Sequence, residues 1–218
     1  GTGKSTDIRV DGPATGSVQI SGGTFHQAVA ATADSTITVT GGTFTDTENL
    51  QQYIPDGYTI SESGQVGPST TQGTDDVAQV DGRYFKTLQG AVNAAPAGGT
   101  VTLLRNTTVN AAVTVDKDLT LDLGSYTLTG AVGEPGSETG VRALQVVGGT
   151  LELTGTGTGT VTTAGQNSTA FGRESSVIRV GSDDALSAGL VIGAGVHVIA
   201  PASYGVTIFG GTENSVYT

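Results

Sequence analysis

The chain contains no cysteine, methionine or tryptophan, and only 13% of its 218 residues are charged. Without cysteine it has no disulfide, no thiolate metal ligand and no cysteine nucleophile. The nine lysines and arginines are scattered and the net charge is −11. This balance argues against binding to nucleic acid or anionic membranes, because phosphate binding needs a basic footprint. No apolar run approaches the roughly 18 residues that a membrane-spanning helix needs.

Glycine, threonine and valine are abundant instead. The 35 glycines and the many β-branched residues favour strands and tight turns over helices. Low charge and abundant glycine would also suit a disordered linker, but a disordered chain normally holds few β-branched residues. A hydrophobic content of 36% is compatible with a buried core in a chain of this length. We therefore expect a folded, strand-rich protein.

A β-branched run followed by Gly-Gly-Thr recurs along the chain, and internal repeats of this kind indicate stacked architectures. The copies occupy residues 18–25, 37–44, 144–150 and 206–212. The first two copies are 19 residues apart, and the 62 residues from 144 to 206 predict three turns of about 20 residues each. In a solenoid each turn buries its inner face against its neighbours. The paired glycines would supply the unusual φ angles at the corners between sheets.

Between the glycine pairs, apolar and polar residues alternate as they do in strands with one buried face. Examples are residues 113–115, 119–123, 126–128, 151–153 and 196–199. An antiparallel sandwich or barrel would show the same alternation, but it would not explain near-identical glycine motifs at a regular period. The pattern favours an all-β fold, and specifically a right-handed parallel β-helix, or β-solenoid.

One segment breaks the strand pattern and predicts a short capping α-helix near residues 86–95. Thr87 fits the N-cap position, and Leu88, Ala91, Val92 and Ala95 fall on one helical face. Because the strand at 100–104 follows directly, we expect the helix to cover the open end of a solenoid core.

A turn-rich stretch precedes that helix and predicts the domain organisation. Proline, serine and threonine at 68–71 are typical of a linker. We expect residues 1–67 to be the closing turns of one β-helix repeat and 68–77 to be a linker. Residues 78–218 would form a second repeat that starts with the helical cap.

These features together resemble the tandem β-helix repeats of large cell-wall-anchored, adhesin-like surface proteins of gut Gram-positive bacteria. The resemblance covers most of the chain, although Gly124-Ser125 replaces the Asn-Gly corner that is commoner in that family. It implies an extracellular location at the bacterial cell surface or wall, with adjacent repeats of the same polypeptide as neighbours. Its motifs specify a scaffold rather than an activity. The residues that carry it are Tyr84, Thr87, Leu88, Ala91, Val92, Ala94, Ala95, 100–104, 119–123, 41–44 and 53–58.

Acidic pairs are the main candidates for chemistry. Asp183 and Asp184 follow Gly181-Ser182 in an expected loop, and they form a weak candidate calcium site. The other pair, Asp75-Asp76, lies in the predicted linker, where we interpret it as a solvated turn. Adjacent carboxylates on a strand point to opposite faces, which weakens either pair as a catalytic acid and base.

The remaining polar motifs are weaker still. His26 and His197 lack a second histidine at ligand spacing, and alternation places His197 on the outer face. Residues 1–6 resemble the end of a phosphate-binding loop but lack the strand and helix that such a loop needs. Asn106 and Asn167 begin glycosylation-type triplets, and the six tyrosines are expected to pack at corners or caps. We assign no catalytic residue, no cofactor and no firm metal site.

The sequence therefore predicts a non-catalytic structural or adhesive module of a secreted bacterial cell-surface protein, one that contacts host glycans or proteins. The alternative is a polysaccharide-processing enzyme or carbohydrate-binding module on the same scaffold, which would need carboxylates at a fixed separation if catalytic. A third hypothesis is a segment that assembles end to end. Because the chain opens at Gly1 rather than methionine, we expect any export signal or wall anchor to lie outside it.

Overall fold

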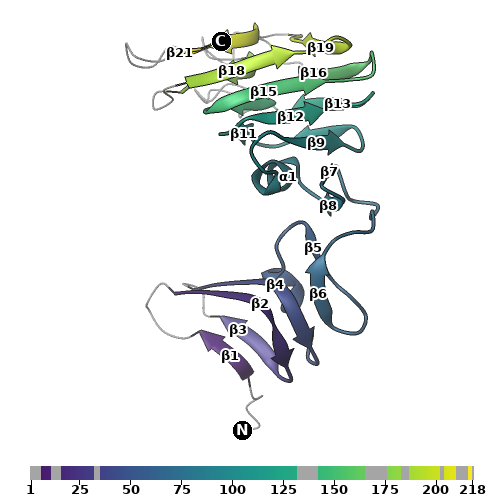
Figure 1. Ribbon diagram of the computed structural model, residues 1–218, viewed down its shortest axis with the longest axis vertical. Coiled ribbons are helices and arrows are strands. Elements are labelled where there is room, and N and C mark those ends of the chain that lie inside the picture. The colour runs from purple at the N-terminus through teal and green to yellow at the C-terminus, as the bar shows by residue number, and fades with distance from the viewer. Residues whose placement is uncertain are drawn as a thin grey trace. The chain divides into compact units, whose positions relative to one another are not determined.

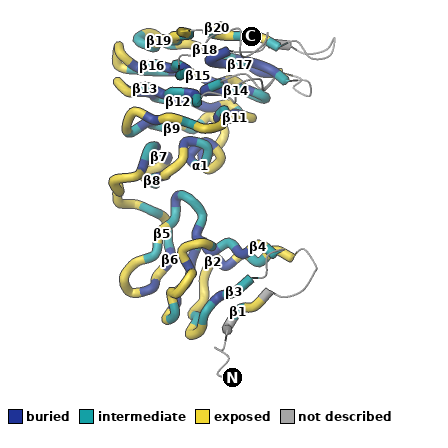
Figure 2. The backbone as a smooth tube through the Cα atoms, turned by 180° about the vertical axis from the view of Figure 1, so that it is seen from behind, coloured by how far each residue is buried: buried dark blue, intermediate teal, exposed yellow. Residues whose placement is uncertain are grey.

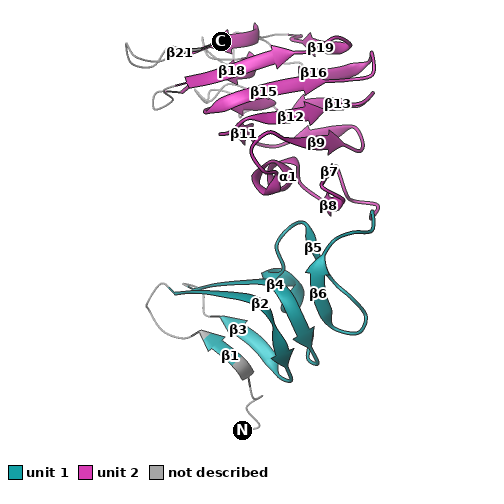
Figure 3. Cartoon of the chain, in the orientation of Figure 1, with its two compact units in different colours: residues 1–72 teal, residues 73–218 magenta. Residues whose placement is uncertain are grey.

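The protein is built mainly of β-strands, as the sequence predicts (Figure 1). The computed structural model describes residues 6–10, 16–31, 35–131, 142–164, 176–182, 187–201, 204–209 and 216–217. The chain divides into two compact units, residues 1–72 and residues 73–218 (Figure 3). The division falls inside the segment 68–77 that the sequence marks as a linker. Within the described ranges, no helix is long and apolar enough to cross a membrane.

Unit 1 contains two short parallel sheets and an antiparallel hairpin. Strand β1 pairs with β3, and β2 pairs with β4, both in parallel. The hairpin of β5 and β6 then adds to β4 in antiparallel fashion. The elements are β1 (Thr6–Val10), β2 (Ser17–Phe25), β3 (Ala28–Ala31), β4 (Thr36–Phe44), the 3-10 helix η1 (Leu50–Tyr53), β5 (Tyr58–Ile60) and β6 (Gln65–Pro68).

The two glycine motifs of unit 1 lie side by side. Val18 pairs with Ile37 and Phe25 pairs with Phe44, so corresponding residues of the two copies lie opposite each other on β2 and β4. The rings of Phe25 and Phe44 stack with their centroids 4.8 Å apart. The two copies therefore occupy equivalent positions on paired parallel strands.

Unit 2 distributes its strands over three sheets. Two are four-stranded and parallel, with orders β10-β13-β16-β19 and β11-β14-β17-β20. The third has the order β21-β18-β15-β12-β9-β7-β8 and is parallel except at the β7–β8 and β7–β9 pairs. From β9 onward, each set of three consecutive strands adds one strand to each sheet.

The bounds of these elements follow the alternating segments of the sequence. They are β7 (Ala78–Val80), β8 (Arg83–Phe85), α1 (Leu88–Ala94), β9 (Gly99–Leu103), β10 (Thr107–Val109), β11 (Val113–Val115), β12 (Leu119–Asp122), β13 (Thr127–Gly130), β14 (Leu144–Val146), β15 (Gly149–Thr154), β16 (Gly159–Thr163), β17 (Ser176–Val180), β18 (Ser187–Ile192), β19 (Val196–Ile199), β20 (Tyr204–Ile208) and β21 (Val216–Tyr217).

The prediction of a regular repeat period is wrong beyond the first step of unit 2. Val101 pairs with Leu121, and this step has the length that the sequence predicts. Leu144, however, pairs with Ile178, and Ile178 pairs with Val206, so both of these later steps are longer. The interval from 144 to 206 therefore holds two steps where three were predicted. Connections between paired strands can lengthen without disturbing the ladder, since loop closure costs little per added residue.

The glycine pairs are only partly the corners that the sequence suggests. Gly23 and Gly42 have φ angles of 101° and 112°, but both lie inside strands, where the pairing of β2 with β4 is irregular. Gly149, with φ of 63°, does lie at a corner, where the chain passes from β14 into β15. A left-handed conformation favours glycine at all three positions.

The predicted helix is confirmed, and it forms the covered end of the core of unit 2. Thr87 is its N-cap, and the Thr87 hydroxyl accepts a hydrogen bond from the Gly90 N–H at 3.1 Å. Leu88, Ala91 and Val92 are buried in the same apolar cluster as the inner residues of the strands (Figure 2). The helix contacts β7, β8, β9 and β11.

Candidate functional site

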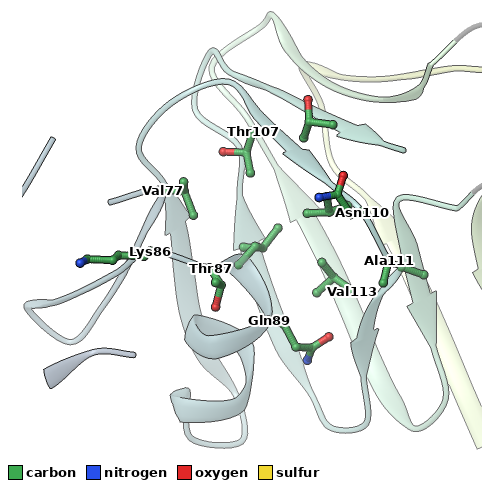
Figure 4. A pocket seen from close by; sticks show the side chains of 12 residues that line it. Val77, Lys86, Thr87, Gln89, Thr107, Asn110, Ala111 and Val113 are labelled. Carbon is green, nitrogen blue, oxygen red and sulfur yellow. The ribbon is translucent and has the colours of Figure 1, made fainter. Parts of the chain in front are cut away.

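A pocket of about 330 Å³ lies beside α1 in unit 2 (Figure 4). Its lining comes from the segment that enters the helix and from β10 with the turn that leads to β11. Leu88 and Val113 are buried and, with the half-buried Val77 and Val109, make its apolar part. The lining residues are Val77, 86–89 and 107–113.

Two polar side chains at this pocket, Thr108 and Asn110, are exposed. Thr107 is buried, and its hydroxyl donates to the Arg105 carbonyl at 3.0 Å. The side chain of Lys86 extends away from the other labelled residues in Figure 4. Thr108 thus offers a hydroxyl and Asn110 an amide beside the apolar residues of the pocket. This combination suits recognition of a small polar ligand.

Gln89 fixes the wall between the helix and β11. Its side-chain amide donates to the Thr114 carbonyl at 3.0 Å, and its carbonyl oxygen accepts from the Thr114 N–H at 2.7 Å. The amide thus bonds to an edge strand as a neighbouring strand would, because β11 is the first strand of its sheet. The two hydrogen bonds that join α1 to β11 therefore also fix one wall of the pocket.

Threonines form a second polar surface on the sheet β10-β13-β16-β19. Thr108 pairs with Thr129, which pairs with Thr162, and Thr127 pairs with Thr160. The residues between them, Leu128 and Val161, are fully buried, so the threonines point outward. We call these five threonines the threonine face. Neighbouring strands of a sheet lie about 4.8 Å apart, and Thr108 joins the threonine face to the pocket.

The candidate calcium site at Asp183 and Asp184 lies outside the described residues. The other pair differs from the prediction. Asp75 is exposed, but Asp76 is 5% exposed, and its carboxylate accepts the Gly73 N–H at 2.6 Å. The prediction of a solvated turn is wrong for Asp76, because its carboxylate closes the turn. Within the described ranges no three His, Cys, Asp or Glu side chains gather as a metal site would need.

Both histidines lie at exposed positions, and His197 faces outward as predicted. A ring nitrogen of His197 lies 3.1 Å from the Gly157 carbonyl oxygen, and Nδ1 of His26 lies 3.4 Å from the Thr45 hydroxyl. The described contacts of the two histidines are thus with a backbone carbonyl and a threonine hydroxyl.

The other sequence motifs are divided between described and undescribed residues. Asn106 is exposed, and its side-chain oxygen accepts the Thr127 N–H at 2.9 Å, whereas Asn167 and residues 1–5 lie outside the described ranges. Tyr53 is half-buried, and its hydroxyl accepts the Ala31 N–H at 3.2 Å, which fits the predicted packing role. Tyr126 and Tyr204 are instead exposed by 37% and 62%.

The sequence did not single out the pocket. Its lining joins the segments 86–89 and 107–113, which are separate in the sequence, and neither segment carries a binding motif by itself. Comparisons with protein-family models, with curated proteins and with solved structures found no match for this chain.

Proposed function

We propose that unit 2 is a right-handed parallel β-helix and that the chain is a non-catalytic structural and adhesive module of a bacterial cell-surface protein. The observation that carries the proposal is the order of the strands, in which each set of three adds one strand to each of three sheets. Inward residues of these sheets are apolar and buried, as stacked coils require. Right-handedness follows from the strong preference of parallel connections for that hand.

The adhesive role rests on the pocket beside α1 and on the threonine face. Hydroxyl and amide groups at fixed spacing match the hydroxyl groups of a glycan or the backbone of an extended peptide. A pocket of about 330 Å³ is at the small end of ligand sites, and it suits a single sugar ring or one side chain. We propose a host glycan as the first ligand class and a host protein as the second.

The extracellular location rests on the resemblance of the cap, strand and closing motifs to wall-anchored repeats. The N-cap at Thr87 and the buried face of α1 support it. The open reading frame that encodes the parent protein tests this part. A signal peptide, further repeats and a wall-sorting segment are expected, and a cytosolic enzyme domain on the same chain would contradict it.

A glycan array probed with the intact 218-residue chain tests the ligand. We expect binding to a subset of glycans that Asn110→Ala and Thr108→Val weaken together, because both side chains border the pocket. Thr59→Val is the matched control, since Thr59 is an exposed strand threonine in unit 1. Equal losses in the control and the pocket variants would contradict the site.

A reducing-end release assay on the same glycans separates adhesion from the enzymatic alternative. Release of many reducing ends per protein molecule would overturn the proposal of a non-catalytic module. Binding without turnover supports it.

A further inference from the structure

The three sheets of unit 2 differ in what borders their first parallel strand. Beside β9 lies β7, where Gln79 pairs with Thr102. Beside β11 lies the Gln89 side chain, which bonds to both backbone groups of Thr114. Strand β10 pairs with β13 alone among the described strands, and residues 35–131 are described without a gap. The side of β10 that faces away from β13, which we call the β10 edge, thus lies well inside the described chain.

The backbone of Thr108 faces the β10 edge. Successive residues of a strand direct their N–H and C=O groups to opposite sides. The Val109 carbonyl accepts from the Ala131 N–H at 2.7 Å, so Val109 bonds towards β13. The N–H and C=O of Thr108 therefore point away from β13, and no described residue bonds to them. On β11 the groups of Thr114 point the same way, and there the Gln89 amide meets them.

The pocket beside α1 lies at the β10 edge (Figure 4), because all three residues of β10 line it. Val77 and Val109 pack against the core of unit 2 but are only half-buried, so their apolar surface is incompletely covered here. Leu88 adds a buried apolar side chain to the same lining. A strand laid along β10 would turn every second side chain towards these three residues, since side chains alternate between the two faces of a sheet.

Backbone groups and pocket together favour one kind of ligand. Proteins that bind a peptide by adding it to a sheet take affinity from main-chain hydrogen bonds and specificity from pockets for alternate side chains. The β10 edge offers both, in the N–H and C=O of Thr108 and in the apolar lining. The Gln89 amide at Thr114 shows that an amide is the group that already fills the equivalent place on β11. A peptide backbone supplies such amides at regular spacing.

We propose that β10 binds an extended peptide, which adds to the sheet as a further strand. The peptide backbone bonds to the N–H and C=O of Thr108. Two aliphatic side chains, on either side of a polar residue, contact Val77, Leu88 and Val109, and the polar residue lies beside Thr108 on the outer face. This inference goes beyond the glycan proposal. It shares the pocket but depends on backbone groups, whereas the glycan contact rests on the side chains of Thr108 and Asn110.

A capped serine-valine-threonine-valine-serine peptide, titrated into the intact chain to about 1 mM and followed by amide NMR, tests the binding. We expect saturable binding. Replacing both valines by serine removes the apolar contacts, and N-methylating the three central residues removes the backbone donors. Each change is expected to weaken binding at least about tenfold. No binding of the parent peptide, or equal binding of all three peptides, would overturn the proposal.

Two substitutions at one position separate the backbone from the side chain. Thr108→Pro removes the N–H at the β10 edge, and an edge strand tolerates proline where its nitrogen faces away from the sheet. We expect an unchanged circular dichroism spectrum and no peptide binding. Thr108→Val keeps the N–H and is expected to bind the peptide as the unaltered chain does, although it weakens the proposed glycan contact. Loss of peptide binding in the valine variant, or its retention in a folded proline variant, would overturn the proposal.

Hydrogen exchange in the unaltered chain gives the same answer without any substitution. Without peptide, the Thr108 amide is expected to exchange fast and the Thr114 amide, which bonds to Gln89, more slowly. Bound peptide should slow exchange at Thr108 and change it little at Val109, whose groups face β13. Strong protection of Thr108 in the dilute, peptide-free chain would show that another part of the polypeptide covers β10, and would overturn the proposal. A negative glycan array would leave each of these outcomes unchanged.

Discussion

The two ends of the parallel sheets in unit 2 differ in what covers them. At the first end, α1 and the β7–β8 hairpin pack on β9, and Leu88, Val92 and Phe85 are each 1% exposed. At the last end, Ile208 and Ile192 hold equivalent inward positions and are 64% and 44% exposed. Burial in this fold is therefore supplied by the neighbouring layer of strands, or by a cap that replaces it.

The difference also concerns the strand edges. At the first end, the Gln89 amide bonds to both backbone groups of Thr114, so an edge strand receives the hydrogen bonds that a neighbour would give. In the described part of the chain, β20 is the last strand of its sheet and pairs with β17 alone. At β11, the Gln89 side chain thus takes the place of a neighbouring strand.

The largest expected effect comes from opening the covered end. Leu88→Ala removes a fully packed side chain and should lower the free energy of unfolding of unit 2 by about 2–5 kcal/mol. Ile208→Ala, at the open end, should lower it by under about 1 kcal/mol. Urea denaturation followed on the amide NMR signals of β12 measures both. Similar losses would remove the distinction between the two ends.

A smaller effect separates a covered copy of the glycine motif from an edge copy. Gly41 is buried, and a Cβ there would lie 2.8 Å from the Ser21 carbonyl carbon and closer still to its oxygen. Gly41→Ala should therefore cost about 1–3 kcal/mol of unit 1 stability. Gly22→Ala, at the edge, should change it by no more than about 0.5 kcal/mol. Urea denaturation of the dilute protein, followed on β4 amides, makes the comparison, and a reversed order would contradict the pairing of β2 with β4.

Removing the amide that caps β11 should have a more modest effect. Gln89→Ala deletes both bonds to Thr114 and should cost about 1.5 kcal/mol. Gln89→Glu keeps the acceptor for the Thr114 N–H and loses the donor, so its cost should be intermediate. Faster hydrogen exchange at the Thr114 amide in the alanine variant is the direct readout. Unchanged exchange there would show that the side chain does not protect this edge.

The smallest effect is expected at the helix N-cap. Thr87→Ala removes the acceptor for the Gly90 N–H and should cost about 1 kcal/mol. Thr87→Ser retains a hydroxyl and should preserve most of the stability. Thermal unfolding followed by circular dichroism compares the two, and an equal loss in both variants would assign the effect to the methyl group.

The alternation of apolar residues was enough to predict the strands, and the N-cap at Thr87 with its apolar face was enough to predict the helix. These signals are local, so the sequence carries them directly. The lengths of the ladder steps could not be predicted, because connections of any length return the chain to the same sheet. The prediction for Asp76 was wrong because an acidic pair in a turn-rich segment indicates a solvated turn. The sequence does not show that the Asp76 carboxylate accepts the Gly73 N–H. The pocket joins segments that meet only after folding.

Hydrogen exchange along the strands tests the central contrast most directly. In dilute solution the amides of β12 and β15 should be the most protected, and those of β20 should exchange far faster, because no described strand covers that edge. Uniform protection from β12 to β20 in dilute solution would contradict the account.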